Sequence, residues 1–171
     1  MKKVVLLFIL GLMLTSCEQE KIAFIDSREV FNAYDEKIDL EKRFKQKEDK
    51  FTKRRDSISS AFQLEAKEVE LKIKSMTQKA IQEKYDELSL KQQRLSQQLQ
   101  YEQQAIQQDY NNKIDSLFIK VKDFVEDYGQ KNGYSYILGT NEATVTVLYG
   151  KEEYDISNII TEALNSNYKN Q

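Results

Sequence analysis

The sequence of 171 residues has no histidine, no proline, no tryptophan and a single cysteine. Without histidine, catalysis by a histidine base and histidine-ligated metal sites are excluded. With only Cys17 available, the chain can form neither an internal disulfide nor a zinc site built from several cysteines. The sequence also has no phosphate-binding loop and no framed nucleophile. We therefore expect no enzymatic activity, no cofactor and no metal.

The N-terminus has the pattern of an export signal. Two lysines precede an apolar run, residues 4–14, that is too short for an ordinary membrane-spanning helix. Small residues then lead directly into Cys17, as in the lipobox of bacterial lipoproteins, where the cysteine becomes the acylated first residue. We predict a signal peptide at 1–16, lipidation of Cys17 and a linker at 17–20. The alternative is a plain secretory signal with an incidental cysteine.

Processing would make the chain more acidic. Cleavage removes two lysines and no acidic residue, so Lys plus Arg falls from 26 to 24 against 28 Asp plus Glu, and the net charge moves from −2 to −4. An acidic exported protein is a poor candidate for binding nucleic acid. We expect it in the periplasm or cell envelope, held to a membrane by its acyl chains.

One long stretch, residues 35–128, contains no glycine and no proline, and its apolar residues are spaced by three and four. This pattern predicts helix far beyond the usual globular length. Its 19 basic and 19 acidic residues balance. If both ends return to one body, the stretch is an antiparallel hairpin with its tip within 75–90. No glycine or proline marks the turn, and the weak candidates are residues 75–77 and residues 86–89.

Two polar segments of the hairpin could bind a partner. Residues 42–55 hold eight basic residues against two acidic ones, which could attract acidic lipid headgroups or acidic polypeptide. We favour a solvated face whose charges meet acids on the other limb. The glutamine-rich segment 92–108 could hydrogen-bond an extended peptide, although polar filler is the commoner case.

Short modules flank the long stretch. Apolar or β-branched runs predict three strands, and amphipathic spacing predicts two short helices. Gly129 and Gly133 are expected to end the long helix. The sequence thus predicts a mostly helical α+β fold, in which a small body carries the hairpin arm. The strands are expected at 22–25, 134–138 and 144–149, the helices at 28–34 and 156–165, the body at 21–34 and 129–167, and a tail at 168–171.

These modules resemble the OmpH/Skp family of periplasmic chaperones. The resemblance covers about a third of the mature chain, and the arm matches by pattern only. Its motifs are Lys21–Asp26 followed by Val30-Phe31 at one end, and at the other Gly133–Leu138, Val147–Tyr149 and Asp155–Ser157 with Ile160 and Leu164.

The resemblance implies a homotrimer with a small β-barrel-like core. Hairpins from the three copies would surround a cavity that holds unfolded outer-membrane or exported proteins without ATP. The well-known members are soluble and strongly basic, so no lipid-binding residues are carried over to this acidic chain. The residues assigned to the body and oligomer core are Ile22, Phe24, Tyr136, Leu138, Val145 and Val147.

The hairpin seam could both zip the limbs and leave apolar surface for a client. The candidate client contacts are Phe44, Phe51, Phe62 and Met76. The alternative function is a structural or tethering coiled-coil lipoprotein of the envelope without a client. The strand-bearing modules favour the chaperone, because a plain spacer needs no such body.

Overall fold

The computed structural model describes residues 20–141 and 145–170. The chain divides into two compact units. One spans residues 33–120, and the other combines the residues before 33 with those from 121 onward. The predicted signal peptide and Cys17 lie outside the described residues.

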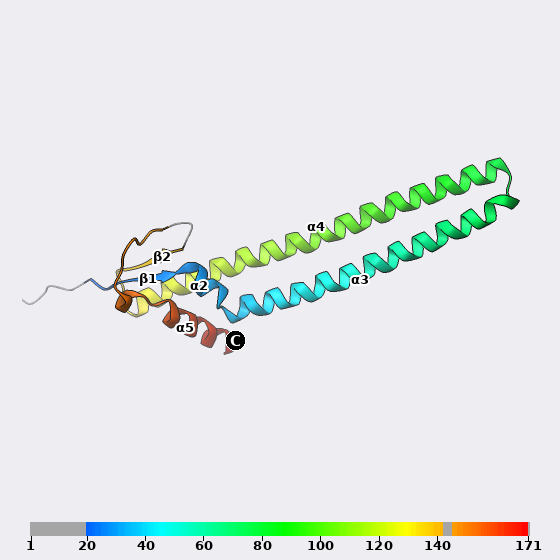
Figure 1. The fold of residues 1–171 in the computed structure, drawn as a ribbon. Coiled ribbons are helices and arrows are strands. Elements are labelled where there is room, and N and C mark those ends of the chain that lie inside the picture. Colours follow the sequence, from blue (N-terminus) through cyan, green and yellow to red (C-terminus); the bar gives the residue numbers. More distant parts are fainter. Residues whose placement is uncertain (1–19, 142–144, 171) are drawn as a thin grey trace, which may run out of the picture. The chain divides into compact units, whose positions relative to one another are not determined.

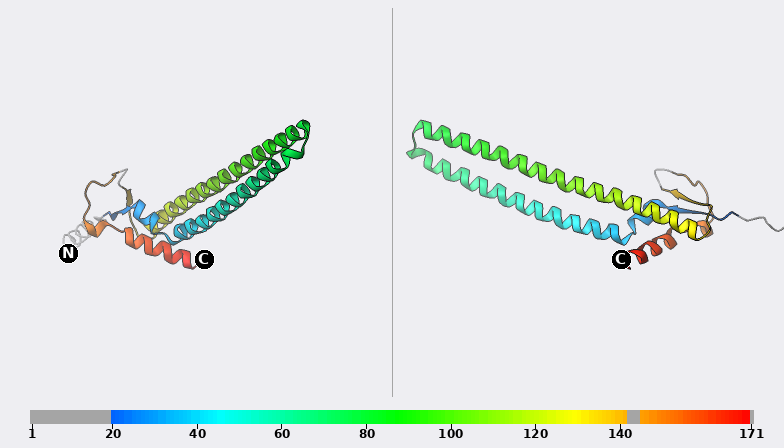
Figure 2. Two further views of the ribbon diagram at one scale, coloured as in Figure 1. Left: turned by 45° about the vertical axis from the view of Figure 1, so that its right-hand side comes forward. Right: turned by 180° about the vertical axis from the view of Figure 1, so that it is seen from behind.

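The unit of residues 33–120 is an antiparallel helical hairpin (Figure 1 and Figure 2). Its first limb is helix α3 (Asp35–Lys72), which continues into a short 3-10 helix, η1 (Ile73–Ser75). Its second limb is helix α4 (Gln78–Lys131), whose residues from Val121 onward belong to the other unit. The 38 residues of α3 extend about 57 Å at about 1.5 Å per residue. The prediction of long helices that form a hairpin is confirmed.

The hairpin turns at Met76 and Thr77, within the predicted window of residues 75–90 and at the earlier of the two candidate positions. The later candidate, residues 86–89, is wrong, because those residues lie inside α4. A helix of this composition continues until its backbone groups find other partners. The turn therefore depends on nearby side chains that can form hydrogen bonds with the backbone groups at the helix ends.

Hydroxyl groups supply those partners. The Oγ of Ser75 donates a hydrogen bond to the carbonyl of Lys72 at 2.9 Å. The Oγ1 of Thr77 accepts one from the backbone amide of Ala80 at 3.3 Å, as an N-cap residue does at the start of a helix. These caps explain how a turn forms without glycine or proline.

Helix α4 ends at Lys131, three residues beyond the expected end at 128. Gly129 lies inside the helix, where a Cβ would approach the Ile137 side chain to 3.2 Å, so its role is close packing rather than termination. Gly133 ends the helix with a φ of +69°. The amide of Tyr134 donates to the carbonyl of Gly129 at 3.0 Å, which is the long-range bond of a Schellman motif.

The other unit contains a two-stranded parallel sheet. Strand β1 (Ile22–Asp26) pairs with β2 (Tyr136–Thr140) in a register that sets Ile22 beside Tyr136. Parallel strands need a crossover connection, and here the whole hairpin lies between them in the sequence. On β1, Ala23 and Ile25 are buried, as the twofold alternation of a strand requires.

Two short helices cover this buried face (Figure 1). Helix α2 (Ser27–Asn32) and helix α5 (Ser157–Lys169) pack on each other and on β1. Asp26 caps α2, since its Oδ1 accepts the amides of Arg28 and Glu29 at 2.9 Å each. Helix α5 runs into the segment expected to be a tail. The buried side chains of these helices include Val30, Ile160 and Leu164, and Ile156, which directly precedes α5, is buried as well.

The expected third strand is not found, since residues 145–149 form no strand. The second edge of β1 is partly occupied by another segment. The amide of Ile156 donates to the carbonyl of Phe24 at 3.0 Å, and Phe24 and Asp155 form an isolated parallel bridge. The short 3-10 helix η2 (Glu152–Tyr154) precedes this bridge. Residues 145–149 therefore do not pair with this edge of β1, and within the described residues they do not pair with the outer edge of β2 either.

Candidate functional site

Large apolar side chains of α3 and α4 meet between the two limbs, and we call this contact the seam of the hairpin. Phe44 of α3 packs edge-on against Tyr110 of α4, with 5.3 Å between the ring centroids. Such an aromatic pair contributes about 0.5–1.5 kcal/mol beyond the burial of its area. The buried residues of this unit's seam are Leu40, Phe44 and Phe51 on α3, with Ile106 and Leu117 on α4.

The four candidate client contacts fall into two groups. Phe44 and Phe51 are buried in the seam, so they hold the two limbs together and offer almost no surface to another molecule. Phe62 and Met76 are half-buried and retain accessible surface. In this conformation, only the second pair could contact a client.

Sequence reasoning missed the apolar side chains that the hairpin exposes most. Leu71 is 73% exposed, and Leu64, seven residues earlier, lies on the same outward side of α3. In a sequence, such positions can be recognised as apolar residues that fall outside the three- and four-residue spacing of the seam. On α4, the exposed large apolar residues of this unit include Tyr85, Leu90, Tyr101 and Ile119.

Ion pairs between described residues link the two limbs, and we call four of them the ion-pair ladder. Two of them measure 2.6 Å between Lys120 and Glu36, and 2.9 Å between Lys47 and Asp109. The steps between successive pairs are eleven, seven and eleven residues along α3, and the same along α4. Eleven and seven residues are about three and two helical turns, so the ladder follows one line along each limb. In order along α3, the pairs are Glu36–Lys120, Lys47–Asp109, Arg54–Glu102 and Glu65–Lys91.

The ladder determines how the two limbs align with each other more than it adds to the free energy of unfolding. Exposed ion pairs are each worth about 0–1 kcal/mol. A slip of four residues would place Lys47 opposite Lys113 in one direction and Glu65 opposite Glu87 in the other. Like charges that face each other across the two limbs repel. The charge pattern therefore disfavours the nearest wrong registers.

Two carboxylates of the ladder have shifted pKa values. Partial burial acts to raise the pKa of Glu36, but hydrogen bonds from Lys120 and Tyr34 outweigh it, and the pKa is lowered. The hydrogen bond from Lys47 lowers the pKa of Asp109. Both groups are thus held ionised by the lysines of the opposite limb.

The basic segment, residues 42–55, is partly neutralised by these contacts. Lys47 and Arg54 pair with acids of the opposite limb, as the solvated-face interpretation expects. Lys45 and Arg55 pair with acids on α3 itself. Within the described residues, no ion pair is made by the remaining four, which are exposed: Lys42, Arg43, Lys50 and Lys53.

The second face of the small sheet is open. Ile22 and Tyr136 are exposed on it, Tyr136 to 60%, and Leu138 is also exposed. A groove of about 320 Å³ lies beside this face, and Phe24, Leu138 and Val147 are among the residues that line it. The residues assigned to the body and oligomer core therefore do not form the core of a single chain, because that core lies on the helix-covered face.

The segment that precedes η2 adds to this open apolar surface. Leu148 is 92% exposed, and Val145 and Tyr149 are exposed as well. Gly150 lies against the ring of Phe24, where a Cβ would approach a ring carbon to 2.4 Å. Glycine thus allows this segment to cross the ring of Phe24 closely.

In residues 20–141 and 145–170, no group of three or more His, Cys, Asp or Glu side chains is placed to hold a metal ion. None of the helices described is both long and apolar enough to cross a membrane.

The sequence and the fold both have recognisable relatives. Residues 21–164 match the family model described as outer membrane protein, OmpH-like. The chain belongs to the OmpH-like family. Its fold is similar to the crystal structure of an OmpH-like protein from Caulobacter crescentus, described as a candidate outer membrane chaperone, with a TM-score of 0.75 and 16% identity over 87% of this chain and 86% of that one. No curated protein matches the sequence significantly.

The resemblance inferred from the short terminal motifs is thereby confirmed. In this OmpH-like chain, both motif blocks contribute to one unit, since residues 21–26 contain β1 and residues 133–138 lead into β2. The hairpin that separates them carries the exposed apolar side chains and the ion-pair ladder. At 16% identity the likeness to the solved structure supports the fold alone.

Proposed function

We propose that this OmpH-like protein is an ATP-independent holdase, which binds unfolded outer-membrane or exported proteins in the cell envelope and prevents their aggregation. The observation that carries this proposal is a long helical hairpin that exposes apolar side chains along its length, in a chain of this family. Unfolded barrel proteins expose strands of alternating apolar residues, which would otherwise pair edge to edge. A surface with many weak contacts can hold many such sequences.

The client contacts that we propose lie on the hairpin. Phe62 and Met76 remain candidates, and Leu64 and Leu71 join them because they are the most exposed apolar residues of α3. None of these side chains belongs to the buried part of the seam. A client could therefore contact them without disrupting the zipped limbs.

We propose that the open face of the sheet is covered by other copies in a homotrimer. Its support is an apolar surface on a very small unit, which is hard to stabilise alone. Leu138→Asp is expected to shift the sedimentation of the chain from trimer to monomer, because it buries a charge in the interface. Ile159→Asp, a change to an exposed residue of α5, should leave the trimer intact. A wild-type monomer at micromolar concentration would overturn the proposed assembly.

We also propose that Cys17 is lipidated and anchors the protein to a membrane of the cell envelope. The support is the lipobox-like pattern in the sequence. Mass spectrometry of the protein extracted from membranes should show cleavage before Cys17 and added acyl mass. Release of a Cys17→Ser variant into the soluble fraction is the expected companion result, and an unmodified Cys17 in membrane-extracted protein would refute the anchor.

The holdase proposal is tested with the lipid-free chain, residues 18–171. A urea-unfolded outer-membrane barrel protein is diluted into buffer with increasing amounts of this chain, and light scattering is followed. Scattering should be suppressed at about one trimer per client. An unrelated coiled-coil protein of similar charge is the control. Scattering that matches the control would favour the alternative, a structural or tethering lipoprotein.

A further inference from the structure

The two limbs are not held equally along the hairpin. The buried residues of the seam end at Phe51 on α3 and begin again at Ile106 on α4. Around the tip, in residues 66–90, no side chain is buried, and the apolar residues of the seam are at most half-buried. We call residues 66–90 the distal segment. No side chain of residues 52–65 or 91–105 is buried either, so apolar packing is weak throughout the half of the hairpin that contains the tip. What sets the distal segment apart is the loss of ion pairs between the limbs.

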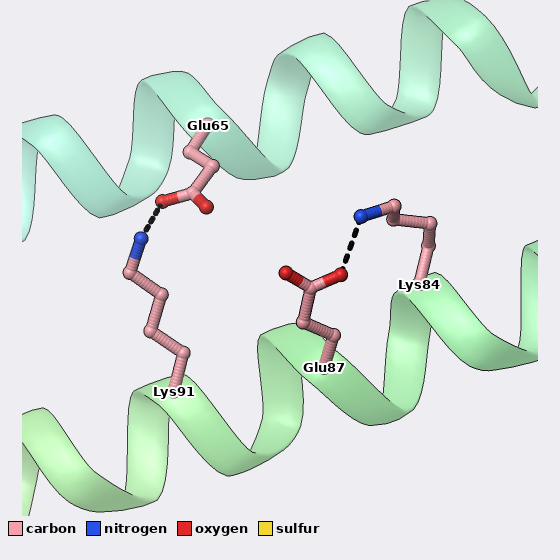
Figure 3. A network of polar contacts seen from close by, with 4 residues as sticks. All are labelled: Glu65, Lys84, Glu87 and Lys91. Carbon is pink, nitrogen blue, oxygen red and sulfur yellow. Dashed lines mark hydrogen bonds and ion pairs between the residues drawn. The ribbon is translucent and has the colours of Figure 1, made fainter.

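Polar contacts between the limbs also stop before the distal segment. The Glu65–Lys91 pair is the last rung of the ion-pair ladder (Figure 3). Within residues 66–90, every ion pair and side-chain hydrogen bond joins groups of one limb or of the turn. These contacts include Lys72 with Glu68, Lys79 with Glu83 and Lys84 with Glu87.

Beyond the last pair of the ladder, the next position along the two limbs carries like charges. A further step of seven residues from the Glu65–Lys91 pair leads to Lys72 on α3 and Lys84 on α4. Each lysine is bound to a glutamate of its own helix. Figure 3 shows Lys84 directed to Glu87 on its own helix, while Lys91 reaches Glu65 on the other. Among the described residues, no ion pair joins the limbs at this position. The attraction across the seam that remains is at longer range: the pKa of Lys84 is raised mainly by its hydrogen bond to Glu87, and only to a smaller extent by the charge of Glu65 on the other limb.

We propose that the distal segment opens locally as a unit, with the Glu65–Lys91 pair at its boundary, and that the opened seam binds unfolded client polypeptide. Opening would uncover half-buried apolar side chains next to Leu71 and Tyr85, which are already exposed. This surface suits the apolar residues of an unfolded strand. The inference rests on the proposed holdase function for its second part only. The side chains that opening would uncover are Val69, Ile73, Met76, Ile81 and Leu88.

Opening is tested first by hydrogen exchange, without any client. In the lipid-free chain, backbone amides of residues 66–90 should exchange about tenfold faster, or more, than those of residues 40–52 and 104–117, because local opening exposes them. Equal exchange in the three segments would overturn the proposed opening. This result does not depend on whether the protein is a chaperone.

Use of the opened seam is tested by locking the limbs. The lipid-free chain has no native thiol, so cysteine pairs can be joined by a short bismaleimide. Lys72→Cys with Lys84→Cys locks the distal segment. Lys47→Cys with Asp109→Cys locks a ladder position at the same place in the register and is the matched control. Each locked protein is compared with its own unlinked form, and circular dichroism checks that both fold.

The distal lock should slow exchange in residues 66–90 and weaken suppression of client scattering several-fold, whereas the control lock should change neither. Unchanged suppression with the distal lock would overturn the role of opening in client binding. Equal loss with both locks would overturn it as well, because general rigidity would then matter. If the unlinked proteins do not suppress scattering, the holdase proposal fails, and the exchange result still decides whether the segment opens.

Discussion

Replacement of Phe44 by alanine is expected to destabilise the hairpin by about 3 kcal/mol. Phe44 is only 7% exposed, and its ring packs edge-on against Tyr110. Truncation of a buried phenylalanine costs about 3–5 kcal/mol in well-packed cores. We take the lower end, because a seam of two helices is bounded by solvent on both sides. The aromatic pair supplies about 0.5–1.5 kcal/mol of this value.

The assay is urea unfolding followed by circular dichroism at fixed protein concentration, since self-association would shift the midpoint. For a slope of about 2 kcal/mol per molar urea, the loss lowers the midpoint by about 1.5 M. Leu64→Ala is the matched control, because Leu64 lies on the same helix but is 61% exposed. Its effect should stay below about 0.5 kcal/mol. Equal midpoints for the two variants would refute the claim that Phe44 holds the two limbs together.

Two further predictions concern hydrogen bonds and pH. Ser157→Ala should cost about 1–3 kcal/mol in urea unfolding, because the buried hydroxyl accepts the amide of Asp26 at 2.8 Å, whereas exposed Ser166→Ala should cost almost nothing. The folded pKa values of Glu36 and Asp109 lie below their ordinary values of 4.5 and 3.8. Their contribution to stability is therefore present at neutral pH and is lost as pH falls through the folded values. The thermal midpoint should therefore drop as the pH is lowered below about 5, and a midpoint that stays constant there would contradict the ladder.

The hairpin could be predicted from the sequence because its signals are local. Apolar spacing and the absence of glycine and proline indicate helix over the whole stretch. Even the tip left a trace in Ser75 and Thr77, whose hydroxyls bond to nearby backbone groups. The end of α4 was less readable, because Gly129 serves close packing against Ile137, and only Gly133 adopts the left-handed conformation.

The interior of the body could not be read from the sequence, because strand pairing depends on distant residues. The β-branched run at 144–149 has strong strand propensity, yet β1 is bridged instead by Asp155. Strand propensity reflects packing context more than backbone preference. For the same reason, alternation in β1 could not tell which face lies under the helices and which is open. Residues such as Tyr136, assigned to a core, are exposed in the single chain.

The ion-pair ladder was only partly visible in the sequence. The expectation that basic residues at 42–55 meet acids on the other limb holds for Lys47 and Arg54. The steps of eleven and seven become recognisable only once the position of the turn sets the register. The same register identifies the position at which the ladder reverses to like charge, Lys72 and Lys84.

Direct binding of an unfolded client tests the central claim most sharply. A labelled outer-membrane barrel protein, diluted from urea below the concentration at which it aggregates, is titrated with the lipid-free chain, and fluorescence anisotropy is recorded. We predict saturable binding to the unfolded client and none to the same protein folded in detergent micelles. No binding, or equal binding to both forms, would contradict the claim that this chain holds unfolded proteins.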